Sequence, residues 1–263
     1  MKFERTEVWG FDHALRGMRN PKNSWDKSDS FVCKECHGGL CKYGIDGGCP
    51  VTDDNNYVIG ENDMKLAQAL IRGGSEHRKF LRQIFVSVDI TAPLYWWKEF
   101  DTYKVGTVAN STSTMHKIAS APITIDCFEV DDYNPRLQLI DPTPLSVRTT
   151  SFIEDLEQLR QLHLLHLDKS KKEYLSEEKR KHHQLVAKQY WKELIRWLPE
   201  SWLQMRTVTF SYENLLAMCS KGQRRFHKLN EWSGTNNPQL DNFISWARTL
   251  PYAQEFIFID ELS

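Results

Sequence analysis

The chain has 263 residues, of which 40% are hydrophobic and 26% are charged, enough for a substantial core in one large domain or two small ones. Its net charge of -1 gives no global electrostatic basis for binding nucleic acid or a membrane surface. The N-terminus lacks the apolar segment of a signal peptide, and no apolar run approaches the roughly 18 residues of a membrane helix. We therefore expect a cytoplasmic protein with no nucleic-acid partner and no membrane partner.

The first sixty residues predict two regular elements and then an irregular insertion. A strand and a short helix, ended by Asn20-Pro21, are expected within residues 1–25. Residues 26–60 are rich in Gly, Cys, Asp, Ser and Asn, which is typical of irregular structure. We expect a Cys-rich insertion over residues 30–52, within a single domain that spans residues 1–263.

The cysteines of this insertion have the spacing of metal ligands. Four of them lie within a short stretch, and the Cys-x2-Cys pair at its start closes a tight thiolate bite. Neighbouring glycines allow the turns that such a knuckle needs. A structural zinc ion is the leading interpretation, while an iron–sulfur cluster, reduced cysteines in a loop and disulfides stay open. The expected zinc ligands are Cys33, Cys36, Cys41 and Cys49.

Helix and strand alternate in the middle of the chain. Asn62-Asp63 predicts the start of a helix, and Gly73-Gly74 predicts its end. Residues 84–90 are a β-branched run typical of a buried strand. Pro93 suits the first turn of a helix that includes the aromatic segment 95–100. This segment predicts either the wall of a small-molecule pocket or the packing face of an oligomer.

The second half of the chain is helical. Apolar residues recur at helical spacing over residues 152–165 and again over residues 185–198. The charged runs between these stripes are expected to be solvated helix faces. Two shorter helices are expected at 212–219 and 243–250. This order predicts an α+β fold with one mixed core and a long helical second half.

A series of short motifs follows in order along the chain: Leu66-x3-Leu70-Ile71-x-Gly73, Glu76-His77, Ala92-Pro93, Asn110-x2-Ser113, Arg206-Thr207, Tyr212-x-Asn214-Leu215, Arg225 and His227-Lys-Leu-Asn-Glu-Trp232. In this order the motifs resemble the flavin-dependent thymidylate synthases, and in particular a divergent branch of that superfamily of the phage and Firmicutes type. The resemblance covers most of the chain outside the Cys-rich insertion. It implies a thymidylate-synthase-like mixed α/β core.

The signature segment departs from the family's pattern. Where the family has an Arg-His-Arg cluster, this chain has Tyr103-Lys104-Val105, which leaves one positive charge. Asn110 and Ser113 match the pattern, but Ser111 replaces an acidic residue and Met115-His116 replaces Arg-Tyr. The resemblance implies an FAD site formed by His77, Tyr103, Asn110 and His116.

The resemblance also implies a pyrimidine deoxynucleotide, dUMP, as ligand. Its phosphate needs cationic and hydroxyl donors that converge on one point, and arginine offers a planar bidentate fork. The candidate donors are Lys104, Ser111, Ser113, Arg206 and Arg225. Other roles stay open for these residues and for His77: a structural salt bridge at Arg206, a surface basic patch at Arg225, and helix capping at the hydroxyl run and at His77.

The implied activity is transfer of a one-carbon unit from a folate to C5 of the base, mediated by reduced flavin. The family uses no protein nucleophile, so no catalytic side chain is expected and the site acts through orientation and electrostatics. The alternative is a non-catalytic nucleotide-binding or interaction protein that kept the fold and lost the flavin chemistry. Because the family forms its flavin sites between subunits, the resemblance implies a homotetramer.

Overall fold

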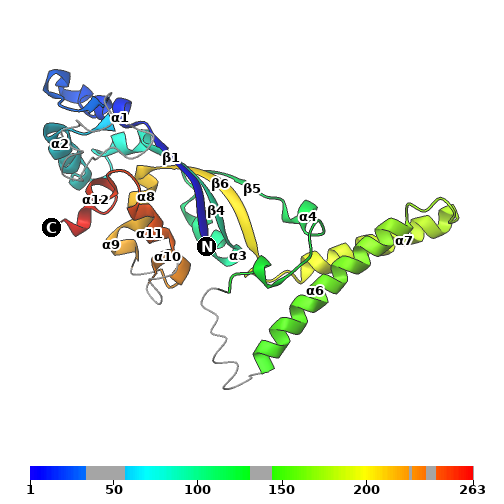
Figure 1. Ribbon diagram of the computed structural model, residues 1–263. Coiled ribbons are helices and arrows are strands. Elements are labelled where there is room, and N and C mark those ends of the chain that lie inside the picture. Colours follow the sequence, from blue (N-terminus) through cyan, green and yellow to red (C-terminus); the bar gives the residue numbers. More distant parts are fainter. Residues whose placement is uncertain (34–56, 131–143, 225–226, 235–240, 263) are drawn as a thin grey trace, which may run out of the picture. The chain divides into compact units, whose positions relative to one another are not determined.

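The computed structural model describes residues 1–33, 57–130, 144–224, 227–234 and 241–262 (Figure 1). Most of the Cys-rich insertion is outside these ranges, and so are Cys36, Cys41, Cys49 and Arg225. The chain divides into two compact units. The first comprises Met1–Ile90, Glu99–Asn110 and Arg206–Ser263, and the second comprises Thr91–Lys98 and Ser111–Met205. That the whole chain is one domain stays a prediction.

Two sheets are present in the described part of the chain. The larger sheet has the strand order β1-β4-β6-β5, with β1 at Lys2–Trp9, β4 at Phe85–Pro93, β5 at Val108–Ser111 and β6 at Leu203–Ser211. The smaller sheet pairs β2 (Phe31–Val32) with β3 (Tyr57–Val58) in antiparallel register. Residues 26–60 are therefore not irregular throughout. Each strand has only two residues, too few for a sequence periodicity to reveal.

The first unit contains most of the short helices. The predicted helices at 212–219 and 243–250 are confirmed as α8 and α11, and the first helix buries one face at a spacing of three and four residues. The helices of this unit are α1 (Phe11–Met18), α2 (Glu61–Arg72), α8 (Tyr212–Cys219), α9 (Lys221–Arg224), α10 (Asn230–Ser233), α11 (Phe243–Arg248) and α12 (Ala253–Phe256).

The start of α2 is capped by a residue distant in the sequence. The sequence predicted that Asn62-Asp63 would cap this helix, but both residues lie inside its first turn. Their backbone N–H groups donate to the carboxylate of Asp29, at 2.9 and 3.1 Å. The prediction of the cap was wrong because a carboxylate from another segment satisfies the free N–H groups and complements the helix dipole.

Asp63 instead forms a buried polar centre. Its side chain is fully buried and accepts hydrogen bonds from Nε of Arg19 at 2.5 Å and from the hydroxyls of Ser28 and Ser30 at 2.6 Å. Burial alone would raise the pKa of Asp63, but the two hydroxyls and the guanidinium outweigh it and lower the pKa. This centre holds the chain just before the Cys-rich insertion against α1 and α2.

The aromatic segment forms α3 (Leu94–Phe100) and belongs to the core. Trp96, Trp97 and Phe100 are at most 1% exposed, and the Trp97 indole donates to the carbonyl of Gln204 at 2.9 Å. The interpretation of these three rings as a pocket wall or an oligomer face was therefore wrong. Their apolar surface is already covered within one chain: the two indoles pack edge to face on each other, and Phe100 packs on Phe210 of β6 and Phe243 of α11.

The second unit is built on two long helices that lie side by side (Figure 1). These helices, α6 (Pro144–Lys169) and α7 (Glu177–Arg196), confirm the two helical stripes. The short helix α4 (Thr114–Lys117) also belongs to this unit. Its hydrophobic core contains Ile118, Ile123, Phe128, Leu156 and Leu194.

Glu157 attaches the segment after α4 to α6. Its carboxylate accepts from the backbone N–H of Ile123 at 2.7 Å and from the guanidinium of Arg160 at 2.7 Å. The guanidinium of Arg160 in turn donates to the carbonyl of Ala119 at 3.2 Å. These hydrogen bonds, led by those from Arg160, overcome the effect of burial and lower the pKa of Glu157 to about 2.

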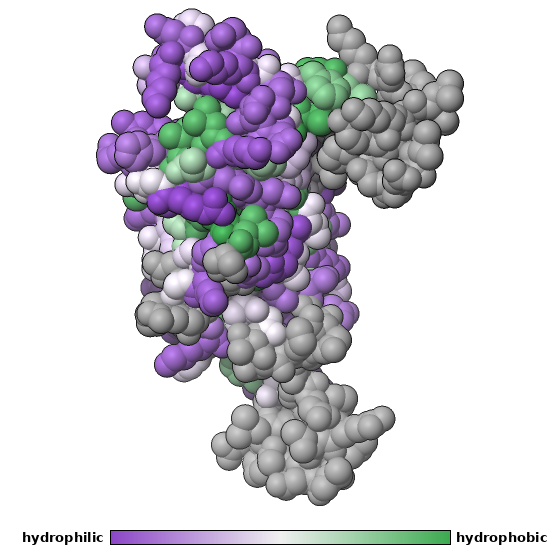
Figure 2. Space-filling model, turned by 90° about the vertical axis from the view of Figure 1, so that its left-hand side faces the viewer, coloured by the Kyte–Doolittle hydropathy of each residue, from purple (hydrophilic) through white to green (hydrophobic). Residues whose placement is uncertain are grey.

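The surface is largely polar where it can be seen. Figure 2 shows a face on which hydrophilic residues predominate and hydrophobic residues form separate patches. None of the helices in the described ranges has the length and apolar content needed to cross a membrane.

Replacing Asp63 with asparagine should strongly destabilise the protein. The variant leaves the guanidinium of Arg19, which is 5% exposed, without a counter-charge, and breaking a buried pair typically costs about 3–5 kcal/mol. Urea unfolding measures this change in the free energy of unfolding. Glu61→Gln is the matched control on the same helix, because its pair with Lys65 is exposed and should contribute no more than about 0.5 kcal/mol. Equal losses in both variants would contradict the prediction.

Glu157→Gln should lower the free energy of unfolding at neutral pH by about 1.5–3 kcal/mol, the usual range for hydrogen bonds to a charged group. The folded-state pKa of Glu157, about 2, lies below its ordinary value of 4.5. The ionised carboxylate therefore stabilises the fold above the ordinary value, and this contribution is lost as the pH falls toward the folded-state pKa. As the pH is lowered through this range, urea unfolding should show a shrinking difference in the free energy of unfolding between the wild type and the variant. A difference that stays constant with pH, or one equal to that caused by the more exposed Glu193→Gln, would refute the prediction.

Candidate functional site

A chain of three polar side chains lies beside the signature segment. The hydroxyl of Tyr103 is 2.9 Å from Nε2 of His227, and Nδ1 of His227 is 3.5 Å from the carboxylate of Glu99. A carboxylate can only accept, so Nδ1 carries the imidazole proton and Nε2 accepts the hydrogen bond from the tyrosine. The tyrosine and the histidine are 124 residues apart in the sequence.

The imidazole of His227 is fixed by aromatic packing. Its side chain is 4% exposed and stacks on Trp232, with ring centroids 4.1 Å apart and an interplanar angle of 12°. The ring of Tyr103 is 5.4 Å from the same indole. Burial lowers the pKa of His227 although Glu99 opposes it, and burial together with Glu99 raises the pKa of Tyr103. Both groups are therefore neutral at neutral pH, as a hydroxyl-to-imidazole hydrogen bond requires.

The turn that follows Tyr103 is held by Asn214. This residue is in the first turn of α8, where it forms a capping box with Ser211. Its side-chain amide also donates to the carbonyl of Val105 at 2.8 Å. Gly106 completes the turn with a φ of +79°, a conformation that favours glycine. The sequence placed Asn214 in a motif without a role, because a contact over such a separation leaves no local signal.

Two of the predicted phosphate donors lie at this turn and have different surroundings. Arg206, on β6, forms an ion pair with Asp101 at 3.1 Å, which is the structural salt bridge left open by the sequence. Lys104 is exposed and forms no ion pair with any residue that the structure describes. The turn therefore has one compensated and one uncompensated positive charge in its described part.

The run of hydroxyl residues 111–114, in the second unit, contributes the cap of a helix in the same unit. The Ser113 side chain caps α4 by accepting from the backbone N–H of His116, and its hydroxyl is 2.7 Å from Nδ1 of the same residue. The capping role that the sequence left open is thus present at Ser113. Ser111 is exposed at the end of β5, and Asn110, which belongs to the first unit, is exposed on the same strand.

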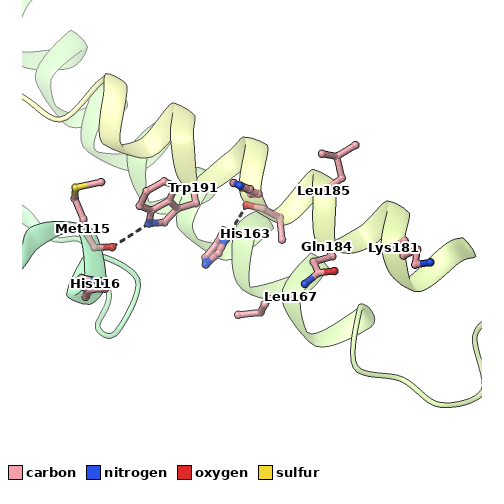
Figure 3. A pocket seen from close by; sticks show the side chains of 10 residues that line it. Met115, His116, His163, Leu167, Lys181, Gln184, Leu185 and Trp191 are labelled. Atoms are coloured by element: carbon pink, nitrogen blue, oxygen red, sulfur yellow. Dashed lines mark hydrogen bonds between the residues drawn. The ribbon is translucent and has the colours of Figure 1, made fainter. Parts of the chain in front are cut away.

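His116 lines a cavity of about 700 Å³ in the second unit (Figure 3). Trp191 and Met115 lie at one end of this cavity and Lys181 lies toward the other. The Trp191 indole donates to the carbonyl of Met115 at 3.1 Å and so joins α7 to α4. With Lys188 also in its lining, the cavity combines an aromatic ring, apolar side chains and cations. Such a lining suits a planar ligand with an anionic group.

The contacts described for His77 do not include Tyr103 or His227. His77 is exposed and lines a different cavity of about 590 Å³ in the first unit, beside α1 and α2. The described lining of this cavity includes Asn20, Leu66 and Phe80 but none of the other predicted site residues. The role of His77 in a cofactor site stays a prediction.

The predicted metal site falls mostly outside the described residues. Cys33 is a buried free thiol at the edge of the insertion. Within the ranges that the structure describes, no group of three or more His, Cys, Asp and Glu side chains is arranged to hold a metal ion. The zinc ion therefore stays a prediction from the sequence.

Comparison with known proteins identifies the fold. No protein-family model matches the sequence, and no curated protein matches it. A crystal structure of the flavin-dependent thymidylate synthase ThyX from Helicobacter pylori, complexed with FAD and dUMP, matches with a TM-score of 0.52 and 16% identity over 99% of each chain. A second structure of that enzyme with FAD and dUMP matches with a TM-score of 0.52 and 15% identity, over 98% of this chain and 96% of that one.

At this level of identity the likeness shows the fold. The chain has the fold of the flavin-dependent thymidylate synthases over nearly its full length, which confirms the α+β fold class and the fold that the resemblance implied.

Replacing Glu99 with glutamine should lower the pKa of His227 further. The carboxylate is the one group that raises this pKa against burial, so its removal leaves burial unopposed. An NMR titration of the imidazole resonances measures the shift. Glu76→Gln removes an exposed carboxylate, 81% exposed, from the same unit and should leave the pKa of His227 unchanged. A higher pKa in the Glu99 variant would contradict the placement of this carboxylate beside the imidazole.

Proposed function

We propose that the protein binds a pyrimidine deoxynucleotide monophosphate, with dUMP as its representative, and that Lys104 and Arg225 bind the phosphate. The observation that carries this proposal is the hydrogen bond between Tyr103 and His227. It links the residue next to Lys104 to a residue two positions after Arg225. In a chain with this fold, one contact thus joins the two sequence segments on which the resemblance places phosphate donors.

The charges around the turn support the same assignment. A phosphate needs positive charge that no protein carboxylate has already neutralised. Lys104 meets this requirement among the described residues, whereas a phosphate at Arg206 would compete with Asp101. His227 is neutral and buried, so it orders the turn and contributes no charge to the phosphate.

The cavity beside His116 fits a flavin in its chemistry. We propose that FAD binds there, with Trp191 against the planar ring system and Lys188 near the phosphates, since Lys181 is already paired with Glu177. The aromatic, apolar and cationic lining supports this proposal. A bound flavin would supply the redox chemistry of one-carbon transfer to C5 of the base. The chain's own residues would bind and orient the ligand and exclude water from its apolar edge.

The remaining partners are proposals that rest on the fold and the resemblance. A folate would donate the one-carbon unit, and four copies of the chain would form a homotetramer. Leu164 and Leu165, on α6, are 37% and 46% exposed, which gives another copy apolar surface to cover.

A second candidate function is nucleotide binding without flavin chemistry. The observation that favours it is the charge of the signature segment, in which Lys104 is the one cation of Tyr103-Lys104-Val105. A flavin dinucleotide has two phosphates and needs more positive charge than a monophosphate does. The two candidates differ in whether FAD binds, and they agree on dUMP.

Arg225→Ala and Lys104→Ala should each weaken dUMP binding about ten- to a hundredfold, because a charge-assisted contact contributes about 1.5–3 kcal/mol. Isothermal titration calorimetry with the full chain measures the affinity. Arg224→Ala is the matched control for the arginine. Lys65→Ala is the control for the lysine, since Lys65 pairs with Glu61 on the exposed side of α2. Both controls should retain the wild-type affinity.

The same titrations separate the two candidates. Binding of dUMP and FAD supports the synthase-like function, and binding of dUMP alone supports nucleotide binding without flavin chemistry. If neither ligand binds at millimolar concentration, or if all four variants bind dUMP as the wild type does, the proposed site is wrong.

A further inference from the structure

Two histidines face one another between the long helices of the second unit. His166 is on α6 and His183 is on α7, and their Nδ1 atoms are 3.1 Å apart. The ring centroids are 5.0 Å apart, and both side chains are partly exposed. Neither residue lines the cavity beside His116. This pair therefore has no part in the function proposed above.

The distance between the two nitrogens matches the separation of two ligand atoms that bind the same metal ion. Histidine nitrogen binds zinc at about 2.0–2.1 Å, so two such nitrogens at a tetrahedral or square angle are separated by about 3 Å. In the metal-free protein the pair shares a single proton, with one imidazole as donor and the other as acceptor. A divalent ion bound by both Nδ1 atoms takes the place of this hydrogen bond, and the proton of the donor ring moves from Nδ1 to Nε2.

We propose that His166 and His183 form a two-histidine binding site for a divalent first-row transition metal ion of the Ni²⁺ or Zn²⁺ class. Imidazole nitrogen suits these ions, whereas Ca²⁺ and Mg²⁺ require oxygen ligands. Two protein ligands leave the remaining coordination positions open to water or an anion. The ion joins α6 to α7 next to the turn that connects them.

The other described contacts of the pair are aromatic. The ring centroids of His166 and Tyr190 are 5.6 Å apart. The ring centroids of His182 and His183 are 5.8 Å apart. Asp168, the nearest acidic residue along α6, is paired with Lys172. Among the residues that the structure describes, no third His, Cys, Asp or Glu side chain joins the pair to complete a metal site, and a site of two imidazoles favours ions that prefer nitrogen.

The test is calorimetric titration of NiCl2 into the full chain, prepared without a polyhistidine tag. Nickel is the probe because it favours imidazole, whereas thiolates of the Cys-rich insertion favour zinc. His166→Gln and His183→Gln should each abolish one equivalent of nickel binding or weaken it at least about tenfold, since removing even an outer-shell partner of a metal ligand costs about 10–100-fold. His163→Gln is the matched control on α6, since its Nδ1 is 2.9 Å from the carbonyl of Ala187. This control should bind as the wild type does.

Unchanged nickel binding in both variants overturns the proposal, and so does an equal loss in the His163 control. A wild-type measurement decides the matter if a variant fails to fold by circular dichroism. In NMR spectra of the wild type, paramagnetic nickel should broaden the resonances of residues 166 and 183 first. Broadening that begins elsewhere and spares these residues overturns the proposal as well.

Discussion

Tyr103 and His227 join two segments that are 124 residues apart in the sequence, and the position of Lys104 depends on this contact. The imidazole is buried against Trp232, so its nitrogen needs a partner within the protein. Loss of the tyrosine hydroxyl would leave that nitrogen unsatisfied at a cost of about 1–3 kcal/mol. The side-chain amide of Asn214 donates to the carbonyl of Val105, in the turn that follows Tyr103. Together, this hydrogen bond and the contact between Tyr103 and His227 fix the backbone of Lys104, whose side chain is exposed.

The distribution of charge around this turn separates residues of similar chemistry. Arg206 and Lys104 are both cations at the signature segment, but Asp101 neutralises the first and leaves the second available to a ligand. Burial keeps His227 neutral, so this imidazole adds no charge to the turn. The positive charges that lack a carboxylate partner mark a site for an anion. The total number of basic residues does not.

Local patterns in the sequence predicted the local structure well. The spacing of apolar residues located α6 and α7, and a β-branched run located β4, because these patterns follow from the geometry of a single element. Contacts between distant segments left no such pattern. The carboxylate of Asp29 that caps α2 is an example, and so is the burial of Trp96 and Trp97 in the core. The resemblance named Tyr103 and Lys104 as candidate site residues, but the sequence could not reveal that Tyr103 pairs with His227 or that His227 faces Glu99.

A crystal structure of the full chain with dUMP would test the central claim most directly. The account predicts a phosphate oxygen at hydrogen-bond distance, about 2.7–3.2 Å, from Nζ of Lys104, with the bond between Tyr103 and His227 intact. Electron density for the nucleotide at another place, with Lys104 still exposed to solvent, would contradict it.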